Sequence, residues 1–407
     1  MKKLLVVSMM FLVLIPYVFA DIEYEEYPIP VVNTEDNLLA PNAKSAILIE
    51  VSTGEILYKY NPHEKLAPAS MTKMMSLVII MDAIEKGVIK YDDKITASSN
   101  AAGMGGSQIL LEEGEQMSVD DLLKGITIAS GNDAVVALAE AIAGSEANFV
   151  KMMNEKAVSM GLKNSYFQNS HGLDAENHYS SAYDMAMIAR ELVKYDKVIE
   201  YSAIYEAYLR EGTNRQTWLV NTNKLVRFKV GVDGLKTGYT NASGYCLTAT
   251  MKKDDMRVIA VVMGEPNSTT RNAEVSHMLD YAFAQYGIQK LLSKNSIVDT
   301  IELDKSKKEK VAVMPVEDVS ILYKKTDGKI VPTYDIKYNK IKRSIKEGEI
   351  IGTLSIMSDD KIVRTVNLTV AEEVKKANLF ELFLRYTRDV IVGNINFIWS
   401  FFVDKSL

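Results

Sequence analysis

The chain has 407 residues, of which 47% are apolar and 25% are charged, and these proportions are typical of a folded protein of about two domains. Its formal net charge of −6 gives no support to a nucleic-acid partner, because binding to phosphates requires clustered positive charge. Cys246 is the only cysteine, so an intramolecular disulfide is excluded.

Residues 1–20 have the pattern of a cleaved export signal. Two lysines precede an apolar run from Leu4 to Phe19, and the small residue Ala20 is followed by an acidic stretch. An uncleaved anchor helix is the alternative, and both interpretations place the rest of the chain outside the cytoplasm. Residues 21–40, which contain several Pro and Glu residues, are predicted to be a linker.

Residues 41–286 show the element order of an α+β domain with one antiparallel sheet. A hairpin is predicted over residues 45–60, because two strand-like runs flank a turn sequence at 52–55. Residues 70–87 are apolar on almost every face, which predicts a buried helix. Two helices broken at 130–132 and another over 180–195 follow. Three strands between 231 and 264, with a hairpin turn at 252–255, and a helix over 271–286 complete the domain.

Residues 287–372 are predicted to form a small all-β domain, because short strand-like runs alternate with turn signals. The tail, residues 373–407, is predicted to be an amphipathic helix that lies in the plane of a membrane surface. Its longest run without charge, Val390 to Val403, is too short and too polar for a membrane span. A terminal helix packed on its own protein is the alternative.

The sequence "APASMTK" places Ser70 three residues before Lys73, a spacing that puts both on one face of a helix. A serine hydroxyl is a weak nucleophile until a base accepts its proton. A lysine with the usual pKa of about 10.4 is protonated and cannot be that base. Burial or a second cation would favour the neutral amine, and the apolar helix after Lys73 could provide the burial.

Two further motifs could complete such a site. "ASGND" places Ser130 and Asn132 on a turn between two helices, where both side chains could face a cleft. "LKTGYT", at the start of a predicted strand, supplies Lys236 as a second cation and Thr237 as a hydroxyl. Gly238 would allow a substrate backbone to approach closely.

S-x-x-K, S-x-N and K-T-G in this order resemble the active-site serine penicillin-binding proteins and class A β-lactamases. "APASMTKMM", "IASGNDA", "NSHGLD" and "GVDGLKTGYT" look most like the D-alanyl-D-alanine carboxypeptidases, the low-molecular-mass penicillin-binding proteins. The resemblance covers the export signal, the α+β domain, the β-domain and the tail. It implies an α+β penicillin-binding-protein/β-lactamase-like fold, followed by a small all-β domain and a C-terminal amphipathic helix.

The resemblance also implies a reaction, a set of partners and a location. The enzyme would remove the terminal D-alanine from peptidoglycan stem peptides that end in D-Ala-D-Ala, and this trimming would limit cross-linking. β-Lactam antibiotics would be covalent inhibitors, and neither a metal nor an organic cofactor is implied. The protein would lie on the outer face of the bacterial cytoplasmic membrane and bind its surface through the C-terminal helix.

The family's functional residues carry over to matching positions of this chain. Ser70 would be the acylated nucleophile, Lys73 its proton acceptor and Ser130 a proton relay to the leaving amine. The implied substrate-binding residues are Asn132 for an amide, Lys236, Thr237 and Arg271 for the terminal carboxylate, Gly238 at the cleft, and Tyr239, whose backbone N–H would form the oxyanion hole with that of Ser70. A surface or helix-start arginine is the alternative for Arg271.

Other interpretations of the reactive residues remain open. His171 and Asp174 could form a triad with Ser70, although a loop-ordering role for the histidine is preferred. The four histidines lack zinc-peptidase spacing, and Cys246 is predicted to be a buried filler. A β-lactamase, with Glu176 as the deacylating carboxylate, an endopeptidase that cuts cross-links and a catalytically silent wall-binding scaffold are the alternative functions.

Overall fold

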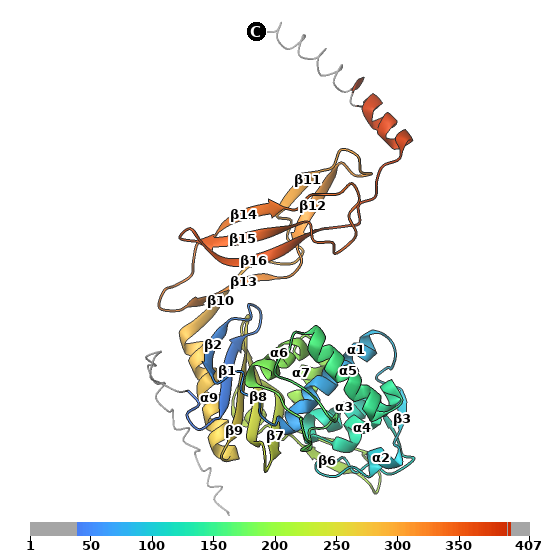
Figure 1. Cartoon of the computed structure of the whole chain (residues 1–407), viewed down its shortest axis with the longest axis vertical. Helices are drawn as coiled ribbons and strands as arrows, with labels where there is room; N and C mark the ends of the chain where they lie inside the picture. Colours follow the sequence, from blue (N-terminus) through green and yellow to red (C-terminus); the bar gives the residue numbers. More distant parts are fainter. Residues whose placement is uncertain (1–38, 389, 392–407) are drawn as a thin grey trace, which may run out of the picture.

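The computed structural model describes residues 39–388, 390 and 391. The predicted export signal, nearly all of the predicted linker and the end of the predicted tail helix lie outside these residues. The described chain has a larger domain, residues 39–285, and a β-domain, residues 286–377 (Figure 1).

A five-stranded antiparallel sheet forms the centre of the larger domain, with the strand order β2-β1-β9-β8-β7. The hairpins predicted at 45–60 and around 252–255 are confirmed. Alternate residues of β1 enter two separate cores, Ile47 and Ile49 on one face of the sheet and Ala46 and Leu48 on the other. The strands are β1 (Ser45–Glu50), β2 (Ile56–Tyr60), β7 (Val232–Thr240), β8 (Gly244–Lys253) and β9 (Met256–Glu265).

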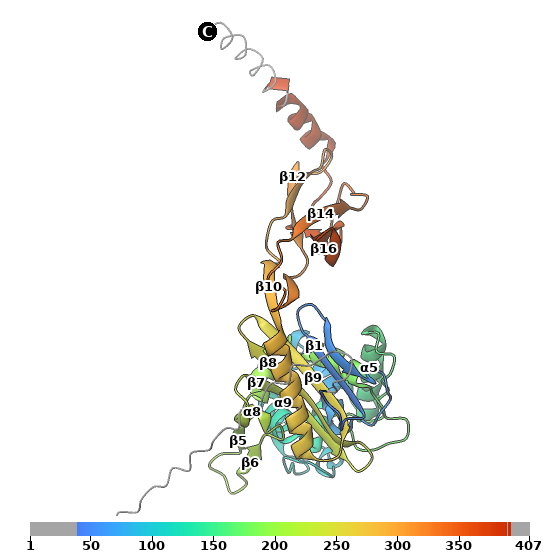
Figure 2. The same ribbon diagram turned by 90° about the vertical axis from the view of Figure 1, so that its left-hand side faces the viewer.

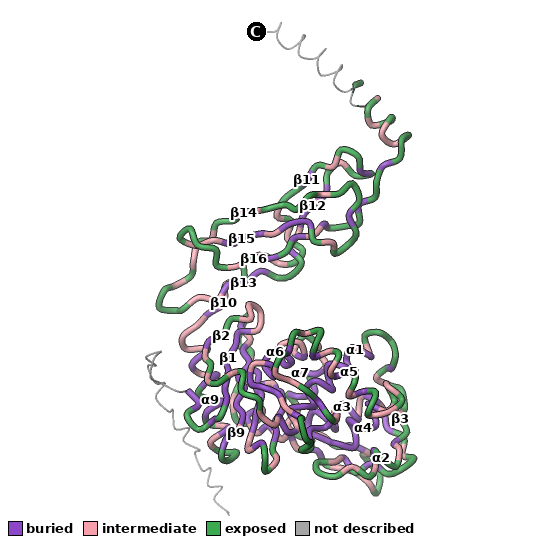
Figure 3. Tube along the Cα trace, in the orientation of Figure 1, coloured by how far each residue is buried: buried purple, intermediate pink, exposed green. Residues whose placement is uncertain are grey.

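Helices cover both faces of this sheet, as Figures 1 and 2 show. The helix α9 (Ser268–Gln285) packs on one face. A helical layer packs on the other, and its central helix α1 is buried along most of its length, as its all-round apolar composition predicts (Figure 3). This layer contains α1 (Lys73–Glu85), α3 (Val119–Ala129), α4 (Asn132–Ala143), α5 (Glu146–Ser159), α6 (Ala182–Leu192) and α7 (Asp196–Ser202).

Shorter elements border the helical layer. They are the 3-10 turn η1 (Ala69–Thr72), α2 (Ser99–Ala102) and two small hairpins, β3 (Lys94–Thr96) with β4 (Gln116–Ser118) and β5 (Glu206–Leu209) with β6 (Thr217–Val220). The short helix α8 (Leu225–Phe228) places Leu225 in the other core, on the α9 face of the sheet.

The β-domain contains strands only, as predicted, in a two-stranded ribbon and a five-stranded sheet of order β11-β12-β16-β15-β14. Residues 379–388 beyond it are helical. No helix of the described residues is both long enough and apolar enough to cross a membrane. The strands are β10 (Tyr286–Leu292) and β13 (Val319–Lys324) in the ribbon, and β11 (Asp299–Glu302), β12 (Lys310–Pro315), β14 (Thr333–Tyr338), β15 (Gly352–Ser358) and β16 (Lys361–Val370) in the sheet.

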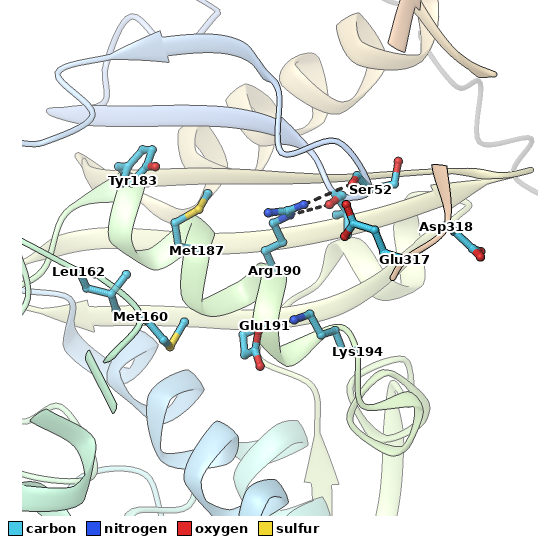
Figure 4. A pocket seen from close by; sticks show the side chains of 12 residues that line it. Ser52, Met160, Leu162, Tyr183, Met187, Arg190, Glu191, Lys194, Glu317 and Asp318 are labelled. Carbon is cyan, nitrogen blue, oxygen red and sulfur yellow. Dashed lines mark hydrogen bonds and ion pairs between the residues drawn. The ribbon is translucent and has the colours of Figure 1, made fainter. Parts of the chain in front are cut away.

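A pocket of about 550 Å³ lies where the two domains meet (Figure 4). The turn after β1 connects them, because the Ser52 carbonyl accepts hydrogen bonds from Arg190 Nη2 of α6 at 3.3 Å and from Arg364 Nη2 of β16 at 3.2 Å. Glu317 and Asp318 reach the pocket from the β-domain. The residues predicted to form the active site do not line it.

Candidate active site

Ser70 lies on the 3-10 turn η1, which runs directly into α1. This continuity places Ser70 and Lys73 on one face, and Lys73 Nζ donates a hydrogen bond to Ser70 Oγ at 3.0 Å. Ala69, just before the serine, has a φ of +47°, a conformation that costs a non-glycine residue energy. Such strain is found where the surrounding structure fixes a functional residue.

The Lys73 side chain is fully buried and has three hydrogen-bond acceptors. Besides Ser70 Oγ, these are Asn132 Oδ1 at 2.6 Å and the His171 carbonyl at 2.7 Å. Burial is the main cause that lowers the pKa of Lys73 well below its usual value, and the charge of Lys236 lowers it further, while Asp133 opposes both. Both causes make the neutral amine that a base requires easier to form here than at an exposed lysine.

The S-x-N motif lies at the junction of α3 and α4. Ser130 ends α3 with a φ of +66°, and its buried Oγ has no hydrogen-bond partner within the described part of the chain. Asn132 begins α4, and its Nδ2 donates to the Gly105 carbonyl at 2.7 Å. Because buried hydroxyls are normally paired, the unpaired Ser130 Oγ is an exception that marks a candidate functional group.

The K-T-G motif lies inside β7, which begins at Val232, and not at the start of a strand as predicted. Lys236 is buried, and its Nζ donates to the Thr237 carbonyl at 3.0 Å. Burial, together with the charge of Arg271, lowers the pKa of Lys236 to about 7. Thr237 Oγ1 donates to Thr222 Oγ1 at 2.8 Å.

Gly238 was expected to make room for a substrate backbone, but its close neighbour in the structure is another part of this chain. A Cβ at this position would lie 2.6 Å from the Pro68 carbonyl oxygen and 3.2 Å from Ala69 Cβ. The glycine thus allows β7 to approach the turn that carries Ser70. The next residue, Tyr239, has a half-exposed ring that packs on Tyr245 with 4.3 Å between ring centroids.

Arg271 lies in the first turn of α9, as the helix-start alternative has it, but it is 5% exposed and is therefore not a surface residue. Its Nε and Nη2 both donate to Asn272 Oδ1, at 3.1 and 2.9 Å. Its charge contributes to the lowered pKa of Lys236, which relates the arginine electrostatically to the K-T-G strand.

The loop "NSHGLD" supports the nucleophile turn from the other side. Gly172 has a φ of +90°, and a Cβ there would lie 1.9 Å from the Ala69 carbonyl oxygen. The ring of His171 faces Glu146, with 3.5 Å from Nε2 to Oε1, and not Ser70. Asp174 accepts a hydrogen bond from Thr240 Oγ1 at 2.8 Å. The described contacts therefore favour a loop-ordering histidine over a Ser-His-Asp triad.

Sequence reasoning missed two residues that shape the site. Asp133 is buried and accepts hydrogen bonds from the backbone N–H groups of Ile109 and Leu111, at 3.0 Å each, which ties the preceding loop to the S-x-N turn. Thr222 contacts Thr237 Oγ1, and its backbone N–H donates to the Ile128 carbonyl of α3. Asp133 could have been found from its place beside Asn132, whereas nothing in the sequence around Thr222 marks it.

Two other kinds of reactive group remain to be placed, the cysteine and the side chain types that bind metals. Cys246 is fully buried opposite Gly238 in the β7–β8 pair, and burial raises the pKa of its thiol to about 11, so it behaves as a core residue. Within residues 39–388, 390 and 391, no group of three or more His, Cys, Asp or Glu side chains could hold a metal ion.

This arrangement defines an active-site serine enzyme of the penicillin-binding-protein class, with the serine and its lysine between an S-x-N turn and a K-T-G strand. The chain belongs to the D-alanyl-D-alanine carboxypeptidase family, whose family model matches residues 32–267. The model of the penicillin-binding protein 5 C-terminal domain matches residues 286–376. The protein is therefore a hydrolase, and its predicted fold class is confirmed.

Relatives support this assignment over both domains. The chain is 50% identical to D-alanyl-D-alanine carboxypeptidase DacF of Bacillus subtilis over 350 residues, which are 86% of this chain and 90% of that protein. Penicillin-binding protein 5 from Haemophilus influenzae has a similar structure, with a TM-score of 0.70, 32% identity and coverage of 82% of this chain and 98% of that one. Penicillin-binding protein D2 from Listeria monocytogenes, solved in its cefotaxime-bound form, has a TM-score of 0.54, 26% identity and coverage of 60% and 97%.

Proposed function

We propose that this protein is a serine-type D-Ala-D-Ala carboxypeptidase that removes the terminal D-alanine from peptidoglycan stem pentapeptides through an acyl-enzyme on Ser70. The proposal rests on the contact between Ser70 and the buried Lys73. The two side chains are hydrogen bonded, and the lysine is buried where its neutral form is favoured. Serine and lysine together thus supply a nucleophile and its base.

In the acylation step, Lys73 Nζ accepts the proton of Ser70 Oγ, and Oγ attacks the carbonyl carbon of the penultimate D-alanine. The backbone N–H groups of Ser70 and Tyr239 stabilise the oxyanion that forms. As the peptide bond breaks, Ser130 Oγ gives a proton to the leaving amine and is reprotonated from Lys73. Free D-alanine leaves, and water later hydrolyses the ester on Ser70.

The cationic side of the cleft binds the substrate. Lys236 and Arg271 attract the terminal carboxylate, and Thr237 turns its hydroxyl proton from Thr222 to the carboxylate when the substrate binds. Asn132 holds a backbone amide of the substrate while it keeps its contact with Lys73. This set explains selectivity for a chain end, because an internal peptide segment lacks the carboxylate.

The domain division and the location belong to the same proposal. Residues 1–20 would be the export signal, 21–40 a linker, 41–286 the carboxypeptidase domain, 287–372 the β-domain and 373–407 a tail whose amphipathic helix lies on the outer face of the cytoplasmic membrane. In the described chain, Val374 and Lys376 still pair with the β-domain, and the helix begins at 379. Leu379, Phe380 and Phe383 are exposed on the described part of this helix. Arg385 Nη2 on its polar side donates to the Ser306 carbonyl at 2.7 Å, which leaves the apolar side free for a lipid surface.

The proposal is tested by intact-protein mass spectrometry after mixing the protein with a peptide that ends in D-Ala-D-Ala, with penicillin in a parallel reaction. Release of D-alanine and a lasting penicillin adduct that maps to Ser70 are expected. A Ser70→Ala variant is the control and should show neither. The proposal would be contradicted by rapid turnover of penicillin without an adduct, which indicates a β-lactamase, by cleavage of cross-linked but not of pentapeptide substrates, which indicates an endopeptidase, or by no reaction, which indicates a scaffold.

A further inference from the structure

Two carboxyl groups are buried next to the elements that carry the K-T-G motif and Arg271. Glu265, the last residue of β9, is 1% exposed, and Glu274, on α9, is 5% exposed. Acidic residues are almost never buried to this extent unless they are paired with donors or cations. The two therefore need a specific explanation.

Their hydrogen bonding differs. Glu274 accepts hydrogen bonds from the backbone and side-chain amides of Asn42. In the described part of the chain, no donor reaches either oxygen of Glu265, and its polar neighbour is the Glu274 carboxyl group itself. Two adjacent carboxylates without donors between them repel each other, and a single proton converts this repulsion into a hydrogen bond.

Arg271 is the cation beside this pair. It lies three residues before Glu274 on α9 and is itself 5% exposed. One negative charge on the pair balances the arginine, whereas two would leave a net buried charge, which is costly. Burial first, and then Glu274, raise the pKa of Glu265 to about 9, and Arg271 opposes them.

We propose that Glu265 holds a proton at neutral pH and shares it with Glu274, so that no second negative charge lies near Arg271. Glu265 is thus a positioning residue that acts through Arg271. This inference rests on the proposed function, in which Arg271 binds the substrate carboxylate. Loss of the shared proton would add negative charge beside the arginine and weaken carboxylate binding.

Other charged and titratable groups surround the pair. Tyr245 lies opposite Glu265 on β8, and Cys246 and Tyr245 both interact electrostatically with Arg271. Tyr58 on β2 interacts with Glu274, and the Lys44 side chain packs against Gly264. Burial raises the pKa of Cys246 and of Tyr58, so both stay neutral over the range in which Glu265 would titrate.

The test compares the wild-type protein with Glu265→Gln, whose neutral amide mimics the protonated carboxyl group, and with Glu155→Gln on the exposed surface of α5 as the matched control. KM for a D-Ala-D-Ala peptide should be the same in all three proteins near pH 7. Towards about pH 10, KM of the wild type and of the control should rise above that of Glu265→Gln by about tenfold, because one unit of charge is added close to Arg271. The kcat values should stay alike.

Two readouts do not depend on activity. Because the pKa of Glu265 is raised on folding, the folded state holds the extra proton between about pH 4.3 and pH 9, and wild-type stability falls as pH rises through this window. The urea midpoint of Glu265→Gln relative to the wild type should therefore rise over the same range. Infrared difference spectra should show a protonated carboxyl band in the wild type that is absent in the variant.

An ionised Glu265 would give a different set of results. If Glu265 is ionised and paired with Arg271, Glu265→Gln will raise KM and lower the urea midpoint already at neutral pH, and the infrared band will be missing from the wild type. That outcome would overturn the inference. Failure of the proposed function would look different, because the wild type would then release no D-alanine while the infrared and unfolding results still report on the shared proton.

Discussion

Lys73 is fully buried and its pKa lies well below the usual value, a combination that is typical of reactive lysines. Replacing Lys73 with Met should preserve the packing of α1 and remove the base. We expect acylation by penicillin to slow by about 10²–10⁴-fold, the usual contribution of a positioned base. The acylation rate is measured by following adduct formation over time by mass spectrometry. A loss of less than about tenfold would assign the proton transfer to another group.

The pKa of Lys236 predicts how substrate binding depends on pH. Its pKa of about 7 means that the side chain is positive below neutral pH and increasingly neutral above it. Because the terminal carboxylate requires the positive form, kcat/KM should fall as pH rises above about 7.

Lys236→Arg is the variant that checks this assignment, because a guanidinium stays protonated throughout the range. The alkaline limb of kcat/KM should move to higher pH in this variant, even if its maximal value is lower. An alkaline limb that stays in place would mean that a different group titrates there.

At the scale of the elements, the nucleophile turn depends on two close backbone contacts, with Gly172 on one side and Gly238 on the other. Gly172→Ala would place a methyl group 1.9 Å from the Ala69 carbonyl oxygen at a φ of +90°. Because the backbone must move, we expect acylation to slow by at least about 100-fold, the effect of a shift of about 1 Å in reacting groups.

Gly161→Ala is the matched control for Gly172→Ala. Gly161 also has a positive φ, +72°, but nothing lies within 4 Å of its Cβ position. It should lose only about 1–2 kcal/mol of stability for the left-handed conformation and keep its acylation rate. Equal losses of activity in the two variants would show that the strain, and not the contact with Ala69, matters.

The elements were largely predictable, and their long-range contacts were not. The alternating pattern of residues 45–60 and the all-round apolar helix after Lys73 follow from local sequence. The contact of Lys73 with the His171 carbonyl, 98 residues away, leaves no local signal. Gly238 is a second example. The sequence predicts that another backbone approaches this glycine closely, but it does not show that the neighbour is the Pro68 carbonyl.

At the scale of the whole molecule, the described chain has separate hydrophobic cores in its two domains. The helix at 379–388 contacts the β-domain through Arg385 and exposes apolar side chains. A chain that ends at Ala377 should therefore fold, leave the membrane fraction and keep its penicillin acylation rate within about twofold, since no site residue is removed.

Cell fractionation followed by penicillin labelling measures both properties of the truncated chain. The full-length Ser70→Ala protein is the control and should stay with the membranes although it cannot be labelled. A truncated protein that still sediments with membranes would contradict the anchor role of residues 378–407.

The position of β7 at an edge of the five-stranded sheet has a consequence for what the enzyme accepts. An edge strand leaves backbone N–H and C=O groups without strand partners, and an extended peptide can pair with them as one more strand. Here that edge includes Thr237 and Tyr239, directly beside the Ser70 turn. A flexible, fully extended chain end can pair with the edge in this way, whereas the terminus of a compactly folded protein cannot. We therefore expect this strand to favour extended chain ends over the termini of folded proteins as substrates.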